Sequence, residues 1–296
     1  MEIKLRTNNS VPQSQSKLIE NEKNLTEQML KTDAFKELND LIGLNSIKKL
    51  LFEIYAFSMI QRKRQQEGLL SDGMVLHALF KGNPGTGKTT VARLIGKIYK
   101  SIGILQRGHV VEIERADLVG EYIGHTAQKT RDQLKKASGG ILFIDEAYSL
   151  ARGGEKDFGR EAIDTLVKGM EDYKDNLILI LAGYKGEMEY FLQSNPGLRS
   201  RFPLQIDFPD YTTLELMEIA EYMLKKREYQ LNPQAKSVLY NFLARSVMLG
   251  DSKEGNARLV RNIIEKSIRR QAVRLISKQT LTKQELMLLV AEDMEK

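Results

Sequence analysis

The sequence predicts an α/β fold in which a parallel sheet of five strands, flanked by helices, is followed by a small all-helical domain. Between residues 75 and 208, short strand-like runs alternate with helix-length segments, a pattern typical of parallel sheets covered by helices. Residues 140–144 and 177–182 are continuously apolar, as expected of strands buried on both faces. After Pro209 the apolar spacing is helical almost to the end of the chain.

The elements can be assigned in chain order. Residues 1–33 are polar with little apolar periodicity, so we expect a loosely ordered tail with a short helix near residues 25–30. From residue 34 the spacing is helical, and Gly43 divides it into a short and a longer helix. A large α/β domain is expected over residues 34–209 and a small domain of three or four helices over residues 210–296. The expected strands are residues 75–80, 109–113, 140–145, 177–182 and 204–208.

Composition excludes several classes of protein. The longest apolar runs are too short to cross a bilayer, and the first residues lack the apolar core of a secretory signal. With no cysteine, the chain forms neither disulfides nor thiolate metal sites. We therefore expect a cytoplasmic protein with no membrane partner. The net charge of +6 is spread along the chain among acidic residues, which favours a solvated surface over a nucleic-acid groove.

The strongest motif is a phosphate-binding loop. Residues 82–89 read GNPGTGKT and match G-x-x-x-x-G-K-[ST], between a predicted strand and a predicted helix. Glycines let backbone N–H groups surround an anion, and the helix N-terminus adds positive potential. Lys88 is expected to reach the β- and γ-phosphates, and the Thr89 hydroxyl to bind magnesium. The predicted nucleotide-binding residues of the loop are Gly82, Asn83, Pro84, Gly85, Thr86, Gly87, Lys88, Thr89 and Thr90.

A second motif completes the expected site. Residues 141–147 read ILFIDEA, a buried strand that brings Asp145 to the carboxyl end of the sheet. We expect Asp145 to hold Mg²⁺ through water and Glu146 to orient the attacking water, although paired acids at this position can also cap a helix. The chain lacks the N-K-x-D motif of GTPases, and a small-molecule kinase needs neither the acid pair nor the helical domain. ATP hydrolysis with ATP and Mg²⁺ is the predicted chemistry.

These motifs, together with NPGLRSRF at residues 195–202 and GNARLVRN at residues 255–262, resemble those of AAA+ ATPases. DLVGEYIGHTAQKT at residues 117–130, IDEAYSL and LAGYKGEM narrow the resemblance to the branch with red-type Rubisco activases and stage V sporulation protein K, the sporulation members being nearer. The resemblance covers roughly residues 36–275. It implies a P-loop AAA+ module with a helical lid, and an ATPase that works as a ring, expected to be a homohexamer.

The resemblance also assigns roles to single residues. Arg201 is similar to the arginine finger that reaches the γ-phosphate of a neighbouring subunit, and Arg199 could share that role. Either arginine could instead pair with an acid of its own chain. Arg258 resembles the sensor-2 arginine of the lid, and we expect Asn256 to cap its helix. Tyr184 follows the fourth strand, where many members carry a polar sensor-1 residue.

Two further segments are implied by the resemblance. Residues 40–43 match the segment that lines the adenine pocket, which makes Leu41, Ile42 and Gly43 binding candidates. Tyr122 and Ile123 match the first pore loop, where an aromatic ring grips a polypeptide, although an ordinary surface tyrosine would look the same.

Three functions fit these assignments. A ring that remodels an unidentified partner protein, in spore formation if the nearer members are a guide, is favoured. A nucleic-acid motor or loader draws support from the basic helix at residues 261–278, and a nucleotide-gated scaffold would assemble with ATP but hydrolyse it slowly.

Overall fold

The computed structural model describes residues 32–122, 124–152, 157–250 and 255–294. The predicted tail, including its short helix near residues 25–30, lies almost wholly outside these ranges, and so does Ile123. Within the described ranges, no helix combines the length and the apolar character that a bilayer crossing requires.

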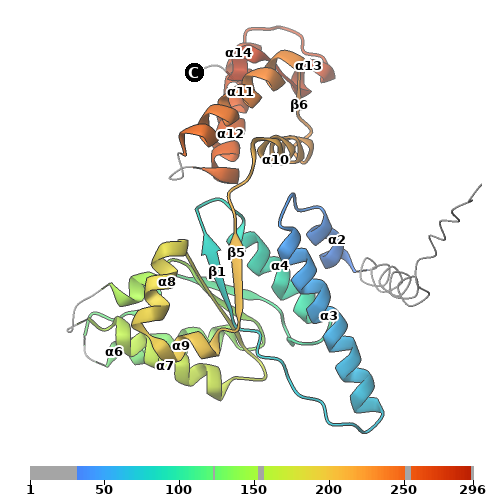
Figure 1. Ribbon diagram of the computed structural model, residues 1–296. Coiled ribbons are helices and arrows are strands. Elements are labelled where there is room, and N and C mark those ends of the chain that lie inside the picture. The colour runs from blue at the N-terminus through green and yellow to red at the C-terminus, as the bar shows by residue number, and fades with distance from the viewer. Residues whose placement is uncertain (1–31, 123, 153–156, 251–254, 295–296) are drawn as a thin grey trace, which may run out of the picture.

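The large domain is built on a five-stranded parallel sheet, as predicted (Figure 1), and the order of its strands is β2-β3-β4-β1-β5. The first strand in the chain is therefore close to the middle, between the fourth and the fifth. This order brings the carboxyl end of β1 beside those of its neighbours. The strands are β1 (Ala78–Gly82), β2 (Val110–Ile113), β3 (Ile141–Ile144), β4 (Ile178–Gly183) and β5 (Leu204–Phe208).

The predicted boundary of the first strand was wrong by three residues. An apolar run begins at Val75, but the hydrogen-bonded ladder begins at Ala78, opposite Ile180 of β4 and Leu204 of β5. The side chain of Val75 is exposed, since no strand lies beside it. His77 directly precedes β1, and its Nδ1 accepts a hydrogen bond of 3.0 Å from the backbone N–H of Leu179.

Helices cover both faces of the sheet because successive strand residues point to opposite sides. Phe80 and Phe143 belong to a core shared with helices α2, α3 and α4. Leu79 and Leu142, one position earlier in each strand, belong to a second core on the other face. The first core is closed by α2 (Asp33–Asn39), α3 (Asn45–Gln66) and α4 (Lys88–Ser101), and the second by α5 (Arg115–Leu118), α6 (His125–Ala137), the 3₁₀ helix η1 (Ala147–Ala151), α7 (Gly159–Asp172), α8 (Lys185–Ser194) and α9 (Pro196–Arg201).

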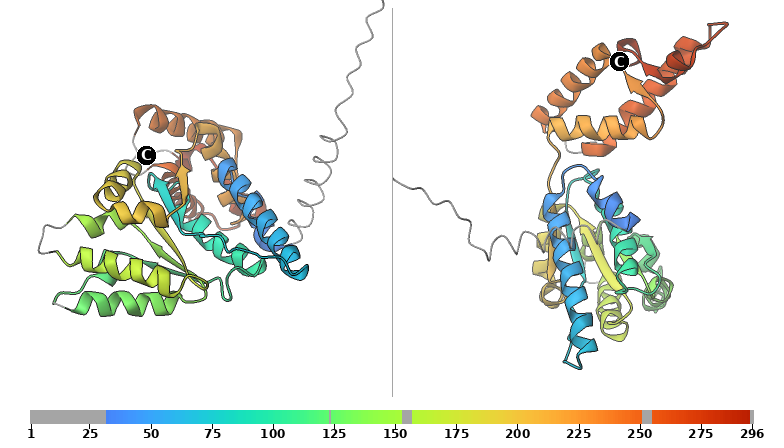
Figure 2. Two further views of the ribbon diagram at one scale, coloured as in Figure 1. Left: turned by 60° about the horizontal axis from the view of Figure 1, so that its bottom comes forward. Right: turned by 90° about the vertical axis from the view of Figure 1, so that its right-hand side faces the viewer.

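The lid has a core of its own and lies beyond one end of the sheet, joined to β5 by a short segment (Figure 2). Its helices are α10 (Thr213–Lys225), α11 (Pro233–Leu249), α12 (Asn256–Leu275), α13 (Lys283–Met287) and α14 (Ala291–Met294). The helical pattern missed one feature, a two-stranded parallel sheet of β6 (Gln230–Leu231) and β7 (Leu288–Leu289). Strands of two residues are too short to show a period.

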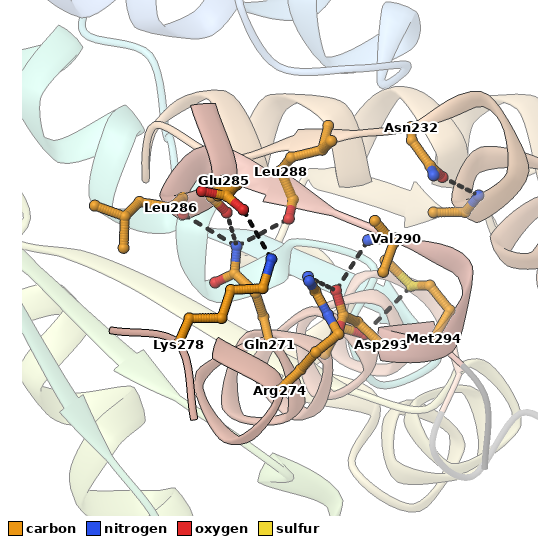
Figure 3. Close-up of polar contacts among 12 residues, drawn as sticks. Asn232, Gln271, Arg274, Lys278, Glu285, Leu286, Leu288, Val290, Asp293 and Met294 are labelled. Atoms are coloured by element: carbon orange, nitrogen blue, oxygen red, sulfur yellow. Dashed lines mark hydrogen bonds and ion pairs between the residues drawn. The ribbon is translucent and has the colours of Figure 1, made fainter. Parts of the chain in front are cut away.

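Polar contacts fix the last helices of the lid to α12 (Figure 3). The side-chain amide of Gln271 donates to the backbone carbonyl oxygens of Glu285, Leu286 and Leu288. Arg274 forms a two-point ion pair with the buried carboxylate of Asp293. Gln271 thus satisfies three backbone carbonyl oxygens, and Arg274 neutralises a buried carboxylate. Together they hold the short last elements of the lid against α12.

Candidate nucleotide-binding site

The phosphate-binding loop connects β1 to α4, which begins at Lys88. The Lys88 ammonium donates hydrogen bonds of 2.8 Å to the backbone carbonyl oxygens of Gly82 and Asn83, so it lies over the loop. Burial lowers the pKa of Lys88, while the Asp145 carboxylate opposes that change. The buried Thr86 hydroxyl donates to the carbonyl of Asn83 at 2.8 Å and braces the turn.

The acid pair lies at the carboxyl end of β3, as predicted, and β4 separates this strand from β1. The backbone N–H of Glu146 donates to a carboxylate oxygen of Asp145 at 3.0 Å. Glu146 has φ of 47°, a left-handed conformation that is costly for a residue with a side chain. Its side chain is exposed at the edge of the sheet rather than used as a helix cap. The strained backbone therefore presents the carboxylate to the space above the phosphate-binding loop.

A cavity of about 590 Å³ brings the two motifs together with the lid, within the size range of small-molecule sites. The large domain contributes the loop, the acid pair and Tyr184, and the lid contributes Arg258. Among the predicted residues it is lined by Leu41, Ile42, Gly82, Pro84, Gly85, Gly87, Lys88, Thr89, Thr90, Asp145, Glu146, Tyr184 and Arg258. A cation, a hydroxyl and a carboxylate thus converge beside an apolar segment, which is the donor set that a nucleoside triphosphate with magnesium needs.

Three predicted binding residues do not line this cavity. Gly43 forms the turn before α3 with φ of 65°, and a side chain there would run into the carboxylate of Glu215. Thr86 is buried inside the loop, and Asn83 points its amide at the carboxylate of Asp210. These three residues therefore support the conformation of the segments that line the cavity without lining it themselves.

The expected cap at the start of α12 was wrong. Gly255 is the residue before the helix, and Asn256 is its first residue, with φ of 63°. In this left-handed conformation the Asn256 side chain turns away from its own helix. Its Oδ1 accepts a hydrogen bond from the backbone N–H of Tyr211, and its amide donates to Asp210 and to the carbonyl of Pro84.

Comparison with known proteins agrees with this geometry. Residues 78–210 match the model of the ATPase family associated with various cellular activities (AAA), and residues 212–296 match the AAA lid domain. Stage V sporulation protein K of Bacillus subtilis (strain 168) is 57% identical over 260 residues, covering 88% of this chain and 81% of the relative. The chain belongs to the AAA ATPase family. It is an ATP hydrolase by that membership, with an AAA domain followed by a helical lid.

Two further relatives of this AAA ATPase include one that is named as an activase. The chloroplastic ribulose bisphosphate carboxylase/oxygenase activase of Cyanidioschyzon merolae (strain NIES-3377 / 10D) is 45% identical over 260 residues, covering 87% of this chain and 88% of the relative. Protein CbbX of Cereibacter sphaeroides is 46% identical over 247 residues, covering 83% and 79%. The predicted resemblance to the branch that contains both kinds of protein is confirmed.

The two arginines of α9 lie away from the ATP site of their own chain. Arg201 lines a different cavity, together with His77 before β1 and Ile178 at the start of β4. Its guanidinium donates to the carbonyl of Gly197 at 2.9 Å and to a carboxylate oxygen of Glu171 at 2.8 Å. The pairing with a local acid that the sequence left open is thus present for Arg201. Arg199 is exposed, and its guanidinium bonds to no residue of the described ranges.

Tyr122 lies between α5 and α6 with its side chain 66% exposed. The ring packs edge-on against that of His125, with 5.5 Å between centroids. The segment before it is anchored, because the Lys129 ammonium donates to the carbonyl oxygens of Ala116 and Val119. The aromatic side chain of Tyr122 is therefore exposed to solvent, while hydrogen bonds fix the backbone that precedes it.

The structure adds site residues that the motifs did not predict. Tyr222 and Arg261 line the cavity from the lid, and Arg261 follows Arg258 by three residues on α12, a helical spacing visible in the sequence. Tyr211 lines it at the hinge, and its hydroxyl donates to the carbonyl of Thr86 at 3.2 Å. Tyr148 does not line the cavity itself, and burial, reinforced by the nearby Glu146 carboxylate, raises its pKa to about 12.

Proposed function

We propose that this AAA ATPase works as a ring-shaped homo-oligomer, with six subunits as the expected number, that couples ATP hydrolysis to remodelling of a partner protein. The separation of the α9 arginines from the cavity of their own chain carries this proposal. An arginine placed there lies too far from the ATP of its own chain to act on it, which supports a role at the ATP of another subunit. Head-to-tail contacts that close into a ring would provide every site with one.

Each residue then has a role in the shared site. Lys88 would hold the β- and γ-phosphates, and Thr89 and Asp145 would hold Mg²⁺. The bound ATP would supply the phosphoanhydride bond that is cleaved, and Mg²⁺ would neutralise negative charge on the phosphate oxygens. Glu146 orients the attacking water, and Arg201 of the adjacent subunit, with Arg199 as its companion, stabilises the charge that develops during transfer.

The proposed client is a protein. Tyr122 is exposed on an anchored base, as a ring that grips an extended chain by apolar contact would be. We take spore formation as the setting because the relative with 57% identity is named for sporulation, and the cytoplasm as the location. The working parts are an ATPase domain at residues 34–209 and a lid at residues 210–296, a division supported by family matches that meet at residues 210–212.

One experiment tests the assembly. ATP turnover and particle mass are measured together over a range of protein concentrations, with and without ATP and Mg²⁺. We expect turnover per subunit to rise as a ring-sized particle replaces the monomer. Constant turnover by a persistent monomer would refute the shared site. Stimulation by DNA that falls steeply with salt would instead favour a nucleic-acid motor.

A further inference from the structure

The lid touches the phosphate-binding loop directly, through the first residues of α12. The backbone N–H of Ala257 donates to the carbonyl of Gly85 at 3.1 Å. A side chain at Gly85 would come within 2.7 Å of the Gly255 carbonyl oxygen and 2.9 Å of the Arg258 backbone nitrogen. Only glycine allows so close an approach, so loop and lid meet backbone to backbone.

Asp210 joins three parts of the molecule at this contact. It lies in the hinge between β5 and α10. Its carboxylate accepts hydrogen bonds of 3.0 and 2.8 Å from the side-chain amide of Asn83 in the loop. The same carboxylate accepts a bond of 2.8 Å from the amide of Asn256 in the lid. One charged group therefore ties loop and lid to the hinge by charge-assisted bonds.

Asn256 is the most constrained member of the group. Its side chain is buried, and every described polar contact it makes leads to the hinge or the loop. The backbone has φ of 63°, which asparagine tolerates better than most residues that carry a side chain. Its position two residues before Arg258 means that any shift of Asn256 also moves that guanidinium, which lines the ATP cavity.

We propose that Asp210 and Asn256 are positioning residues that couple the geometry of the phosphate-binding loop to the angle of the lid. A change in the loop would reach α12 through Asn83, Asp210 and Asn256, and lid movement would travel back along the same bonds. The lid angle and the position of Arg258 would then depend on the conformation of the phosphate-binding loop. The inference rests on ATP binding by one subunit and not on the ring or the client.

The decisive test exchanges donor and acceptor between the two residues. Asn256→Asp sets two carboxylates against each other, and Asp210→Asn removes the charge that both amides share. In the double variant the new amide at position 210 can donate to the new carboxylate at position 256 and still accept from Asn83. The carboxylate at 256 can also still accept from the Tyr211 backbone N–H. We expect Asn256→Asp to weaken ATP binding about tenfold and the double variant to recover most of that loss.

Lid movement supplies a second measurement, whose dependence on nucleotide would not change in Asn256→Asp if Asp210 and Asn256 only stabilised the fold. Because the chain has no cysteine, Asp164→Cys and Asn241→Cys create a unique pair of label sites on exposed positions of α7 and α11. The distance between the labels is measured with ATP, with ADP and without nucleotide. In the parent we expect distinct distances for these states, and in Asn256→Asp one broad, nucleotide-independent distribution. The double variant should restore the parent's response.

A second pair of variants guards against unfolding. Asn256→Gly keeps the left-handed backbone and removes only the side chain. Asn232→Gly is its match, because Asn232 also accepts a backbone hydrogen bond, of 2.7 Å from Ala235, but it caps the lid helix α11 and does not contact the loop. Only Asn256→Gly should weaken ATP binding and broaden the label distances. Equal effects of the two, or a double exchange variant no better than Asn256→Asp, would overturn the coupling. Binding and distances are read at concentrations where the protein is monomeric, so they stand even if no ring forms.

Discussion

The two ends of the large sheet differ in what they contribute to catalysis. At the carboxyl ends of β1 and β3, one chain supplies the phosphate-binding loop, the acid pair and a lid that closes over them. At the amino ends of β1 and β4, the same chain presents α9 with Arg199 and Arg201. β1 has five residues, so the two regions are separated by roughly 16 Å of strand. A single chain therefore carries both parts of the proposed site and cannot join them.

The polar contacts at the two ends differ in the same way. Around the loop, hydrogen bonds run between loop, hinge and lid, and fix the geometry that ATP meets. At α9, Arg201 has one acidic partner, and 35% of its side chain remains exposed. An exposed ion pair contributes only about 0–1 kcal/mol, so it yields readily to a stronger anion. The end that binds is preorganised, and the end that we propose completes the site of a neighbour can be released.

The largest expected effect comes from removing the proposed finger. Arg201→Ala should lower kcat by about 10³-fold or more, because transition-state charge loses its cation. ATP affinity of the isolated subunit should stay within about twofold of the parent, since Arg201 does not line its own cavity. Steady-state turnover of the assembled protein and nucleotide binding by the monomer measure the two quantities. Arg199→Ala, measured in parallel, shows which arginine dominates.

Mixing variants tests whether the two ends act in trans. Arg201→Ala subunits keep an intact ATP cavity, and Lys88→Ala subunits keep an intact α9. A ring that contains both includes sites made of two intact halves, so activity should return over a range of mixing ratios. Failure to recover any turnover at every ratio would break the comparison on which the proposed assembly rests.

The next largest effect concerns the binding end alone. Glu146→Gln should reduce turnover by about 10²- to 10³-fold and leave ATP affinity nearly unchanged, because the amide keeps the shape but cannot polarise water. Single-turnover hydrolysis and equilibrium binding of ATP separate the two. Lys88→Ala is the contrasting change, since it should abolish nucleotide binding. Normal hydrolysis by Glu146→Gln would exclude this carboxylate as the group that orients water.

The binding end could be predicted from the sequence because its residues are neighbours in the chain. GNPGTGKT and ILFIDEA each lie at the end of a strand, and a parallel sheet places such ends together. The five strands were predicted for a similar reason, since short strand-like runs stand out between helix-length segments. What misled the prediction at Val75 was a mainly apolar run that begins three residues before its hydrogen-bonded ladder.

The contacts that the sequence did not reveal join residues far apart in the chain. Asp210 meets Asn83 across 127 positions and Asn256 across 46. No motif spacing records such a meeting, because tertiary packing alone decides it. Asn256 was misassigned as a cap because asparagine favours both caps and left-handed conformations, and only the fold decides between them. The partner of Arg201 was unpredictable for a related reason, since Glu171 lies on a different helix.

A fourth prediction concerns pH at the α9 end. Burial lowers the pKa of His77 from 6.5 to about 4, and its Nδ1 already accepts a hydrogen bond. The neutral ring is therefore favoured in the folded state, so its stabilisation is full above about pH 6.5 and is lost as the pH falls toward 4. By pH 5 the loss should be about 2 kcal/mol. Denaturant unfolding at several pH values measures it, and His77→Asn, which keeps an acceptor but does not titrate, should show a shallower decline. Equal slopes for the two proteins would contradict the assignment.

The smallest expected effect tests whether the ion pair with Glu171 restrains Arg201 of α9 within its own chain. Glu171→Ala removes the acid that holds Arg201 within its own chain. An exposed ion pair contributes up to about 1 kcal/mol, so the protein concentration for half-maximal turnover should fall by about two- to fivefold while kcat stays the same. Glu265→Ala is the matched control, because it breaks a lid ion pair of similar exposure with Arg227 and should leave that concentration unchanged. A higher concentration requirement for Glu171→Ala would mean that Glu171 orients Arg201 for its neighbour rather than restraining it, and the α9 end would then be as preorganised as the ATP cavity.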